Sequence, residues 1–278
     1  RAIFIENLAN PGGIVADLEA IVKIANEAGV PLVVDNTLAT PFLSQPLEWG
    51  ADLVVHSTTK YLSGQGNAVG GVVIDSGKFP WLGNSKYPSL SAPSAEYNGL
   101  IFAETFGDLA YTMYSHAVSL RDLGCTQSPM NAWITLNGVE TLPLRMERHC
   151  SNGLAVAEFL EKHQNVDWVS HAGLKSSPYY KLGKKYFPNG TGSLFAFGVK
   201  GGYESGLKLL ESVELFSHVA NLGDTRSLIL HPASTTHRQL TEEQRIASGA
   251  GPEVVRLSVG IECAEDLISD LHQALNKL

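Results

Sequence analysis

The sequence predicts an α/β protein in which a large domain, residues 1–141, is built on a parallel sheet and a smaller α/β domain spans residues 142–278. Two apolar runs, Leu32–Val34 and Leu53–Val55, predict the sheet, because they lack polar alternation and each is followed by polar residues, as buried parallel strands are. A length of 278 residues suits two domains of ordinary size or one large one.

The first elements form a strand–helix–strand unit. Ala2–Ile5 is apolar and predicts a strand, and Glu6–Gly13 contains an Asn-Pro-Gly-Gly run that predicts a loop. Asp17 is a suitable N-cap for a helix, and Gly29 a suitable stop. The unit predicts a right-handed βαβ crossover onto the strand Leu32–Val34. The apolar face expected of this helix consists of Ile21, Ile24, Ala25 and Ala28.

The part of the chain that follows the second apolar run is expected to complete the large domain. Val72–Ile74 predicts another strand. Asp75–Gly99 is rich in proline, serine, glycine and aromatic residues and predicts a long loop over the surface or over the site. Helices are expected at Thr105–Asp122 and Met130–Asn137.

A long helix that begins near Pro143 is expected to open the smaller domain, since proline suits the first turn of a helix. Strands are expected at Ser193–Val199 and Val254–Val259, and the second of these alternates, with Arg256 on the face opposite its valines and leucine. A terminal amphipathic helix, Glu265–Leu278, is expected to dock on this domain. The apolar period of the long helix comprises Met146, Cys150, Leu154, Ala157 and Leu160.

The ends of the two buried strands carry the candidate chemistry. Asp35 follows the first apolar run, and Lys60 follows the second after a short hydroxyl-rich stretch. Ligands of open α/β sheets bind beyond the carboxyl ends of the strands, so an acid and an amine are expected in one pocket. Pyridoxal phosphate requires a lysine for a Schiff base, a carboxylate on the pyridinium nitrogen and hydroxyls for the phosphate. A solvated loop cation is the alternative for Lys60.

Two stretches carry a family resemblance. Residues 33–71, VVDNTLATPFLSQPLEWGADLVVHSTTKYLSGQGNAVGG, and residues 254–275, VVRLSVGIECAEDLISDLHQAL, closely resemble the Cys/Met-metabolism family of pyridoxal-phosphate enzymes. The resemblance runs from about Ile3 to the last residue. It implies the aspartate aminotransferase-like fold (fold type I), with a large domain truncated at its N-terminal side. Family members carry a preceding segment that supplies a phosphate loop and a stacking aromatic residue, so the chain is expected to be the downstream piece of a longer enzyme.

The resemblance also implies roles for the cofactor-binding residues. Lys60 corresponds to the lysine that forms the Schiff base with the cofactor and acts in catalysis, and Asp35 to the partner of the pyridinium nitrogen. Ser57 and Thr59 correspond to phosphate ligands. Asn10 corresponds to an asparagine near the ring hydroxyl and the substrate, and a simple turn asparagine is the alternative.

Substrate binding is expected at Arg256. An arginine on a strand between apolar residues either pairs with a structural carboxylate or binds an anionic ligand in a bidentate manner. The resemblance implies that Arg256 grips the α-carboxylate of an amino-acid substrate and that Ser227, in NLGDTRSLI, lies near the same carboxylate and Lys60. His149 and Cys150 point about 100° apart on a helix, so packing explains them better than a shared ligand does.

The reaction that the resemblance implies is γ-replacement on O-acetylhomoserine with sulfide or a thiol, which gives homocysteine or methionine. The long Asp75–Gly99 interval and the NLGDTRSLILHPASTTH stretch are typical of the O-acetylhomoserine sulfhydrylase branch. Alternatives are methionine γ-lyase or cystathionine γ-synthase chemistry and, from a different class, a noncatalytic fragment or assembly partner.

Composition excludes other classes of function. The net charge of −8 and the lack of a basic run argue against nucleic-acid binding. The longest apolar runs fall far short of the roughly 20 residues that span a bilayer. Three cysteines without CxxC spacing predict neither a disulfide framework nor a zinc site, and a reducing cytoplasm is expected. The resemblance implies a homotetramer.

Overall fold

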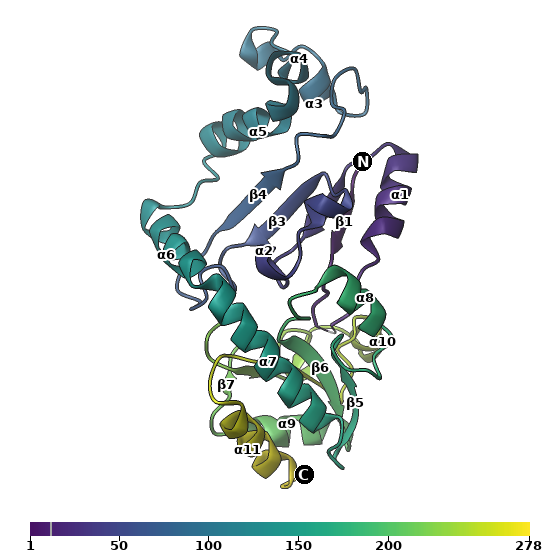
Figure 1. The fold of residues 1–278 in the computed structure, drawn as a ribbon, viewed down its shortest axis with the longest axis vertical. Coiled ribbons are helices and arrows are strands. Elements are labelled where there is room, and N and C mark those ends of the chain that lie inside the picture. Colours follow the sequence, from purple (N-terminus) through teal and green to yellow (C-terminus); the bar gives the residue numbers. More distant parts are fainter. Residues whose placement is uncertain (12) are drawn as a thin grey trace.

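The computed structural model describes residues 1–11 and 13–278 and contains two sheets that follow one another along the length of the molecule (Figure 1). The first sheet has the order β1-β2-β3-β4, in which β1, β2 and β3 are parallel and β4 is antiparallel to β3. The predicted parallel strands are therefore confirmed, and the fourth strand runs in the opposite direction. The bounds are β1 Ile3–Glu6, β2 Leu32–Asp35, β3 Leu53–Ser57 and β4 Gly71–Asp75.

The second sheet has five strands in the order β5-β6-β9-β8-β7. β6 and β9, the two strands expected from the sequence, are antiparallel neighbours at its centre. The residues of β9 that face away from Arg256, among them Val255 and Leu257, are completely buried. The bounds are β5 Val166–Ser170, β6 Leu194–Val199, β7 Ser217–His218, β8 Leu228–Leu230 and β9 Val254–Ser258.

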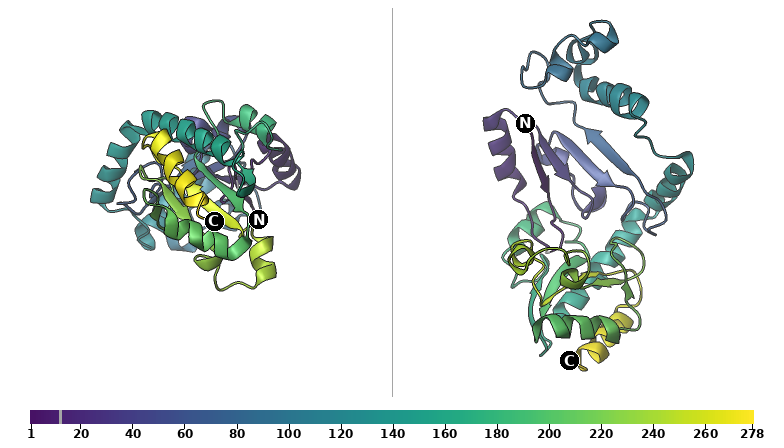
Figure 2. Two further views of the ribbon diagram at one scale, coloured as in Figure 1. Left: turned by 90° about the horizontal axis from the view of Figure 1, so that it is seen from below. Right: turned by 180° about the vertical axis from the view of Figure 1, so that it is seen from behind.

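Helices lie around both sheets, as Figure 2 shows from two further directions. Their bounds are α1 Leu18–Ala28, α2 Thr40–Leu43, α3 Pro88–Ser91, α4 Phe102–Phe106, α5 Ala110–Tyr114, α6 Pro129–Glu140, α7 Leu142–Leu160, α8 Tyr180–Tyr186, α9 Gly202–Ser212, α10 Glu242–Ala247 and α11 Ala264–Leu275. Short 3₁₀ turns occur at Pro46–Trp49, Ala95–Tyr97, Gly107–Leu109 and Pro232–Ser234. No helix in the described residues has the length and apolar character that a membrane span requires.

The strand–helix–strand unit forms as its capping residues predict. The Asp17 carboxylate accepts a hydrogen bond from the Ala20 N–H at the start of α1, and Gly29 ends the helix with a φ of 59°. The predicted apolar face is wrong for Ile24 and Ala28, which are both exposed, because Leu18 and Ala25 define the buried side of α1. Gly12, in the predicted loop, lies outside the described residues.

The region after β4 differs from its prediction. The expected long loop contains α3 and a 3₁₀ turn, and the expected helix Thr105–Asp122 is divided into α4, a 3₁₀ turn, α5 and the π-helical segment Ser115–Asp122. The break follows Phe106, where Gly107 adopts a φ of 53°. These segments enclose a small aromatic core of their own around Trp81 and Phe102, apart from the first sheet (Figure 1).

α6 and α7 connect the two sheets (Figure 1). α7 begins at Leu142 with proline in its first turn, as expected. Val156 and Leu160 of α7 pack with Leu267 and Leu271 of α11 in the core of the second sheet. Thr141 lies between α6 and α7, and the division into domains at this residue stays a prediction.

Candidate active site

Lys60 lies in the turn that follows β3. Two hydrogen bonds fix the backbone of this turn: the Gly64 N–H donates to the Lys60 carbonyl at 2.8 Å, and the Arg145 guanidinium donates to the Tyr61 carbonyl at 2.7 Å. Arg145 is buried, and its position at the start of α7 ties the turn to the connection between the two sheets. The lysine therefore projects from a fixed backbone.

Asp35 is the last residue of β2, directly beside β3. Its Oδ1 accepts a hydrogen bond from the Thr37 N–H at 2.9 Å, and the Thr37 hydroxyl oxygen accepts one from the Ser57 N–H at 2.8 Å. This chain of bonds ties the carboxyl ends of the two strands together. Sequence reasoning did not identify Thr37 as a member of the site.

A cavity of about 180 Å³ lies at these strand ends. Lys60 and Asp35 both line it, so the structure brings the two predicted residues to one cavity. Asn10 reaches the cavity from the loop after β1, where its N–H donates to the Glu6 carboxylate at 2.9 Å. The lining residues are Glu6, Leu8, Asn10, Asp35, Thr37, Leu38, Ser57, Lys60 and Leu222.

Arg256 approaches this cavity from β9 of the second sheet. Its guanidinium donates to the side-chain oxygen of Asn10 at 3.2 Å and to the backbone carbonyl of Asn221 at 3.0 Å. Within the described part of the chain it forms no ion pair with a carboxylate. Burial lowers its pKa from the ordinary value. Arg256 is thus a cation with only neutral acceptors, which suits it to an anionic ligand.

The Lys60 amine contacts Asn221, a residue that the sequence reasoning missed. Its Nζ donates to the Asn221 Oδ1 at 2.6 Å. Burial lowers the pKa of Lys60, and the nearby positive charge of Arg256 lowers it further. Both effects increase the fraction of neutral amine, the form that can accept a proton.

Two predicted residues have partners elsewhere. Ser227 is fully buried, and its hydroxyl donates to the Glu262 carboxylate at 2.9 Å and accepts from the Gly260 N–H at 2.8 Å. The Thr59 hydroxyl bonds to the N–H of Gly70 at 3.1 Å and to its carbonyl at 3.3 Å. Neither side chain is part of the cavity wall. Of the predicted residues, the cavity is lined by Asn10, Asp35, Ser57 and Lys60, with Arg256 bonded to Asn10, and Thr59 and Ser227 are not part of this group. The roles of all these residues stay predictions.

Gly223 is the sequence signal that could have identified Asn221. It has a φ of 71°, and a Cβ atom on it would lie 2.8 Å from the backbone nitrogen of Tyr61. A glycine at this position thus allows the loop to approach the backbone next to Lys60. The prediction took Ser227 from the same stretch because of the family resemblance, and missed the asparagine two residues before the glycine.

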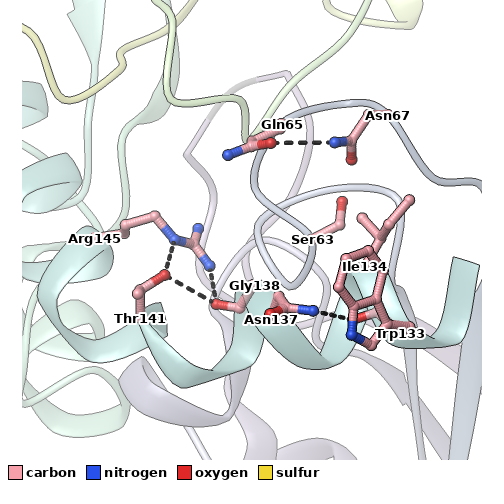
Figure 3. A pocket seen from close by; sticks show the side chains of 9 residues that line it. All are labelled: Ser63, Gln65, Asn67, Trp133, Ile134, Asn137, Gly138, Thr141 and Arg145. Carbon is pink, nitrogen blue, oxygen red and sulfur yellow. Dashed lines mark hydrogen bonds between the residues drawn. The ribbon is translucent and has the colours of Figure 1, made fainter.

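A second cavity, of about 360 Å³, lies on the other side of Arg145 and is shown in Figure 3. There the guanidinium donates to the Thr141 hydroxyl at 3.1 Å and to the Gly138 carbonyl at 2.6 Å. No predicted site residue lines this cavity. Arg145, whose guanidinium also bonds to the Tyr61 carbonyl in the Lys60 turn, forms part of its wall. The lining residues are Ser63, Gln65, Asn67, Trp133, Ile134, Asn137, Gly138, Thr141 and Arg145.

His149 and Cys150 are packing residues, as expected. The His149 Nδ1 lies 2.7 Å from the Val259 carbonyl oxygen, and burial lowers its pKa to about 4. The Cys150 thiol is mostly buried, which raises its pKa to about 11. The described residues contain no group of three or more His, Cys, Asp or Glu side chains that could hold a metal ion.

Comparison with known proteins finds a matching family model and similar sequences. A family model described as Cys/Met metabolism PLP-dependent enzyme matches residues 1–276. The chain is similar to the O-acetyl-L-homoserine sulfhydrylase of Leptospira meyeri, with 48% identity that covers 100% of this chain and 65% of that protein. It is also similar to the homocysteine synthase of Schizosaccharomyces pombe, with 46% identity that covers 99% of this chain and 65% of that protein.

A solved structure has the same fold. The crystal structure of a Campylobacter jejuni protein, described as an O-acetylhomoserine (thiol)-lyase with a pyridoxyl-lysine-5'-monophosphate, matches with a TM-score of 0.95 and 42% identity. The match covers 99% of this chain and 66% of that one, and it confirms the predicted fold class. The chain spans about 65% of the length of the relatives named above.

Proposed function

The chain belongs to the Cys/Met metabolism family of PLP-dependent enzymes, and on this premise we propose that it acts in γ-replacement on O-acetylhomoserine. Sulfide or a thiol replaces the acetyl ester group, which leaves as acetate, and the product is homocysteine or methionine. The observation that carries the proposal is that Lys60 and Asp35 line one cavity, beside an arginine that has only neutral hydrogen-bond acceptors among the described residues. The names of the relatives support the choice of substrate.

The residues of the cavity fit pyridoxal phosphate. Lys60 supplies the amine that would bind the cofactor covalently, Asp35 the carboxylate for its ring nitrogen, and Ser57 a hydroxyl for its phosphate. When bound, the cofactor supplies an electron sink for the bonds at the α-carbon of the substrate. The hydrogen bonds through Thr37 tie the Asp35 carboxylate to the backbone of Ser57 on the neighbouring strand.

Lys60 is proposed to move the proton of the substrate α-carbon. Its lowered pKa increases the share of the neutral amine near neutral pH, so that the lysine can accept this proton and return it. The amine sits on a backbone fixed by Gly64 and Arg145, which limits the search for a productive geometry.

Arg256 is proposed to bind the α-carboxylate of the substrate. Its present acceptors, the side chain of Asn10 and the carbonyl of Asn221, are neutral, and a carboxylate is the stronger acceptor for a guanidinium. Arg256 would thus hold the carboxylate of the substrate while Lys60 moves its α-proton. The C–O bond at the γ-carbon then breaks, and a C–S bond forms at the same carbon.

The proposal extends to self-association into a homotetramer and to a location in the cytoplasm. Exposed apolar side chains on α6, namely Met130, Trp133 and Leu136, support self-association, since apolar surface of this kind is often covered in oligomers. The molar mass of the full-length protein, measured by light scattering, tests the oligomeric state. Localisation of a fluorescent fusion of that protein tests the compartment.

The activity test uses the full-length protein loaded with pyridoxal phosphate. We expect O-acetylhomoserine and sulfide to yield homocysteine and acetate, and methionine alone to yield little ammonia. Lys60→Ala should abolish both the turnover and the absorbance of the lysine-bound cofactor. Faster release of ammonia from methionine than of acetate from O-acetylhomoserine would contradict the proposal and favour a γ-lyase. A full-length protein that shows no cofactor absorbance would favour a noncatalytic role.

A further inference from the structure

Resting on the proposed function, we propose that Asn36 is a positioning residue that, from outside the catalytic cavity, holds the Asp35 carboxylate in place for the cofactor. Asn36 directly follows Asp35, the last residue of β2. Asp35 lines the cavity that Lys60 also lines, whereas Asn36 lines a different cavity, of about 500 Å³, beside α2. The Asn36 side chain therefore acts on the carboxylate only through the chain that joins them.

The side-chain amide of Asn36 has a partner for each of its groups. Its N–H groups donate to the carbonyl oxygens of Thr40 at 3.1 Å and Ser44 at 2.9 Å, and its Oδ1 accepts from the Asn7 side chain at 2.6 Å. A rotated amide would turn its oxygen toward the two carbonyl oxygens, so these contacts permit one orientation only. Asn36 is 1% exposed, and a buried amide without these partners would be costly.

The peptide group between Asp35 and Asn36 is held from both neighbouring strands. The Asp35 carbonyl accepts from the Asn7 N–H at 3.3 Å, and the Asn36 N–H donates to the Val55 carbonyl at 2.9 Å. Asn7 directly follows β1, and Val55 belongs to β3. Asn7 thus contacts the backbone of Asp35 and the side chain of Asn36 at once, which fixes the backbone where the carboxylate leaves the sheet.

The loop that Asn36 closes contains the residue that binds the Asp35 carboxylate. The Thr40 N–H donates to the Asn36 carbonyl at 2.8 Å, so Asn36 bonds to both backbone groups of Thr40. Thr40 has a φ of 59°, which residues other than glycine rarely adopt, and such a conformation persists only where its surroundings hold it. Thr37, whose N–H donates to the Asp35 Oδ1 at 2.9 Å, lies inside this loop. Loss of the Asn36 amide would therefore loosen Thr37 and, with it, the carboxylate.

The test compares Asn36→Ala with Asn152→Ala in the full-length enzyme. Asn152 is a matched control, because it is also 1% exposed and its amide also donates to two backbone carbonyls, those of Gly260 at 3.0 Å and Glu262 at 2.8 Å. Urea unfolding measures the loss of stability in each variant, which we expect to be similar.

The two variants should differ in cofactor binding. For Asn36→Ala we expect the dissociation constant for pyridoxal phosphate, from absorbance titration, to rise about 10-fold or more, because the carboxylate is misplaced. We expect kcat to fall by about 10-fold or more as well, with a change in the KM for O-acetylhomoserine of less than about 3-fold. Asn152→Ala should keep the dissociation constant within about 2-fold of wild type. An equal rise in both variants would overturn the proposal.

A double-variant cycle separates positioning of the carboxylate from a general effect on folding. Because Asn36 is proposed to act through Asp35, Asn36→Ala should change the dissociation constant by less than about 2-fold in an Asp35→Asn background. A combined loss of affinity equal to the product of the two single losses would overturn the proposal.

Asn7→Ala is the milder variant, since it removes the bond to the Asn36 oxygen and leaves the Asn36 amide in place. We expect it to raise the dissociation constant about 3-fold. A wild-type dissociation constant in Asn36→Ala, or in Asn7→Ala where Asn36→Ala does not fold, would overturn the positioning role. These titrations use the cofactor without substrate, so they hold whichever reaction the enzyme catalyses. A wild-type enzyme without cofactor absorbance or sulfhydrylase activity would instead refute the proposed function.

Discussion

Replacement of Gly223 by alanine tests whether the close approach of its loop to the Lys60 turn stabilises the protein. Gly223 has a φ of 71°, where an alanine costs roughly 1–2 kcal/mol. The added Cβ would also lie 2.8 Å from the Tyr61 backbone nitrogen, a contact that the backbone must relieve by moving. Overpacking of this kind costs about 1–3 kcal/mol. We therefore expect Gly223→Ala to lower the free energy of unfolding by about 2–5 kcal/mol, the sum of these two costs.

Gly249→Ala provides the control for this measurement. Gly249 has nearly the same φ, 72°, but a Cβ atom there meets nothing within 4 Å. The conformational cost is then common to both variants, and the difference between them isolates the collision with Tyr61. Urea unfolding of the full-length protein, followed by circular dichroism, measures both losses. Equal losses in the two variants would refute the idea that Gly223 is required for the close approach.

Three further substitutions address the site and its surroundings. Asp35→Asn should reduce kcat by about 100-fold or more and weaken cofactor binding, because the negative charge proposed to face the ring nitrogen is lost. Absorbance titration with pyridoxal phosphate measures the binding. Unchanged affinity and rate would contradict the role of Asp35. Arg256→Gln should raise the KM for O-acetylhomoserine about 10-fold or more and move the acid limb of the rate profile to higher pH. The sign of that shift follows because Arg256 lowers the pKa of Lys60, so that its removal raises this pKa; an unmoved limb would count against the interaction. His149→Phe should reduce the loss of unfolding free energy that occurs as the pH falls from about 6.5 to 4. The buried imidazole has a pKa of about 4, so the histidine of the unfolded chain binds a proton at a higher pH than that of the folded chain, which favours unfolding. Unfolding free energies at about pH 7 and pH 5 test this, and the same difference in variant and wild type would disprove it.

Local pattern predicted the strands and the two reactive groups well. Leu32–Val34 and Leu53–Val55 are short continuous apolar runs followed by polar residues, as buried parallel strands are, and their ends place Asp35 and Lys60 at the same cavity. The Asp17 cap and the Gly29 stop are equally local signals, and both are confirmed.

The parts that sequence reasoning missed depend on contacts between distant residues. Asn221 meets Lys60 across 161 positions, and no periodicity in either segment indicates that contact. Ser227 was predicted from the family resemblance, but its hydroxyl donates to Glu262, a partner that only the packing of the second sheet reveals. The segments on either side of the break at Gly107 pack together in the small aromatic core after β4, a set of contacts that the helical pattern did not indicate.

The hydrogen bonds of Arg145 determine which sequence changes the turn after Lys60 tolerates. Its guanidinium contacts backbone carbonyls of Tyr61, Leu62 and Gly138, and every amino acid carries such a group. Apart from Gly64, where a Cβ atom would lie 2.5 Å from the Arg145 Nη1, side chains in that turn can therefore be exchanged without removing an acceptor. An insertion or deletion would shift the carbonyls out of reach and leave a buried cation unsatisfied, so the length of the turn is constrained more strongly than its composition.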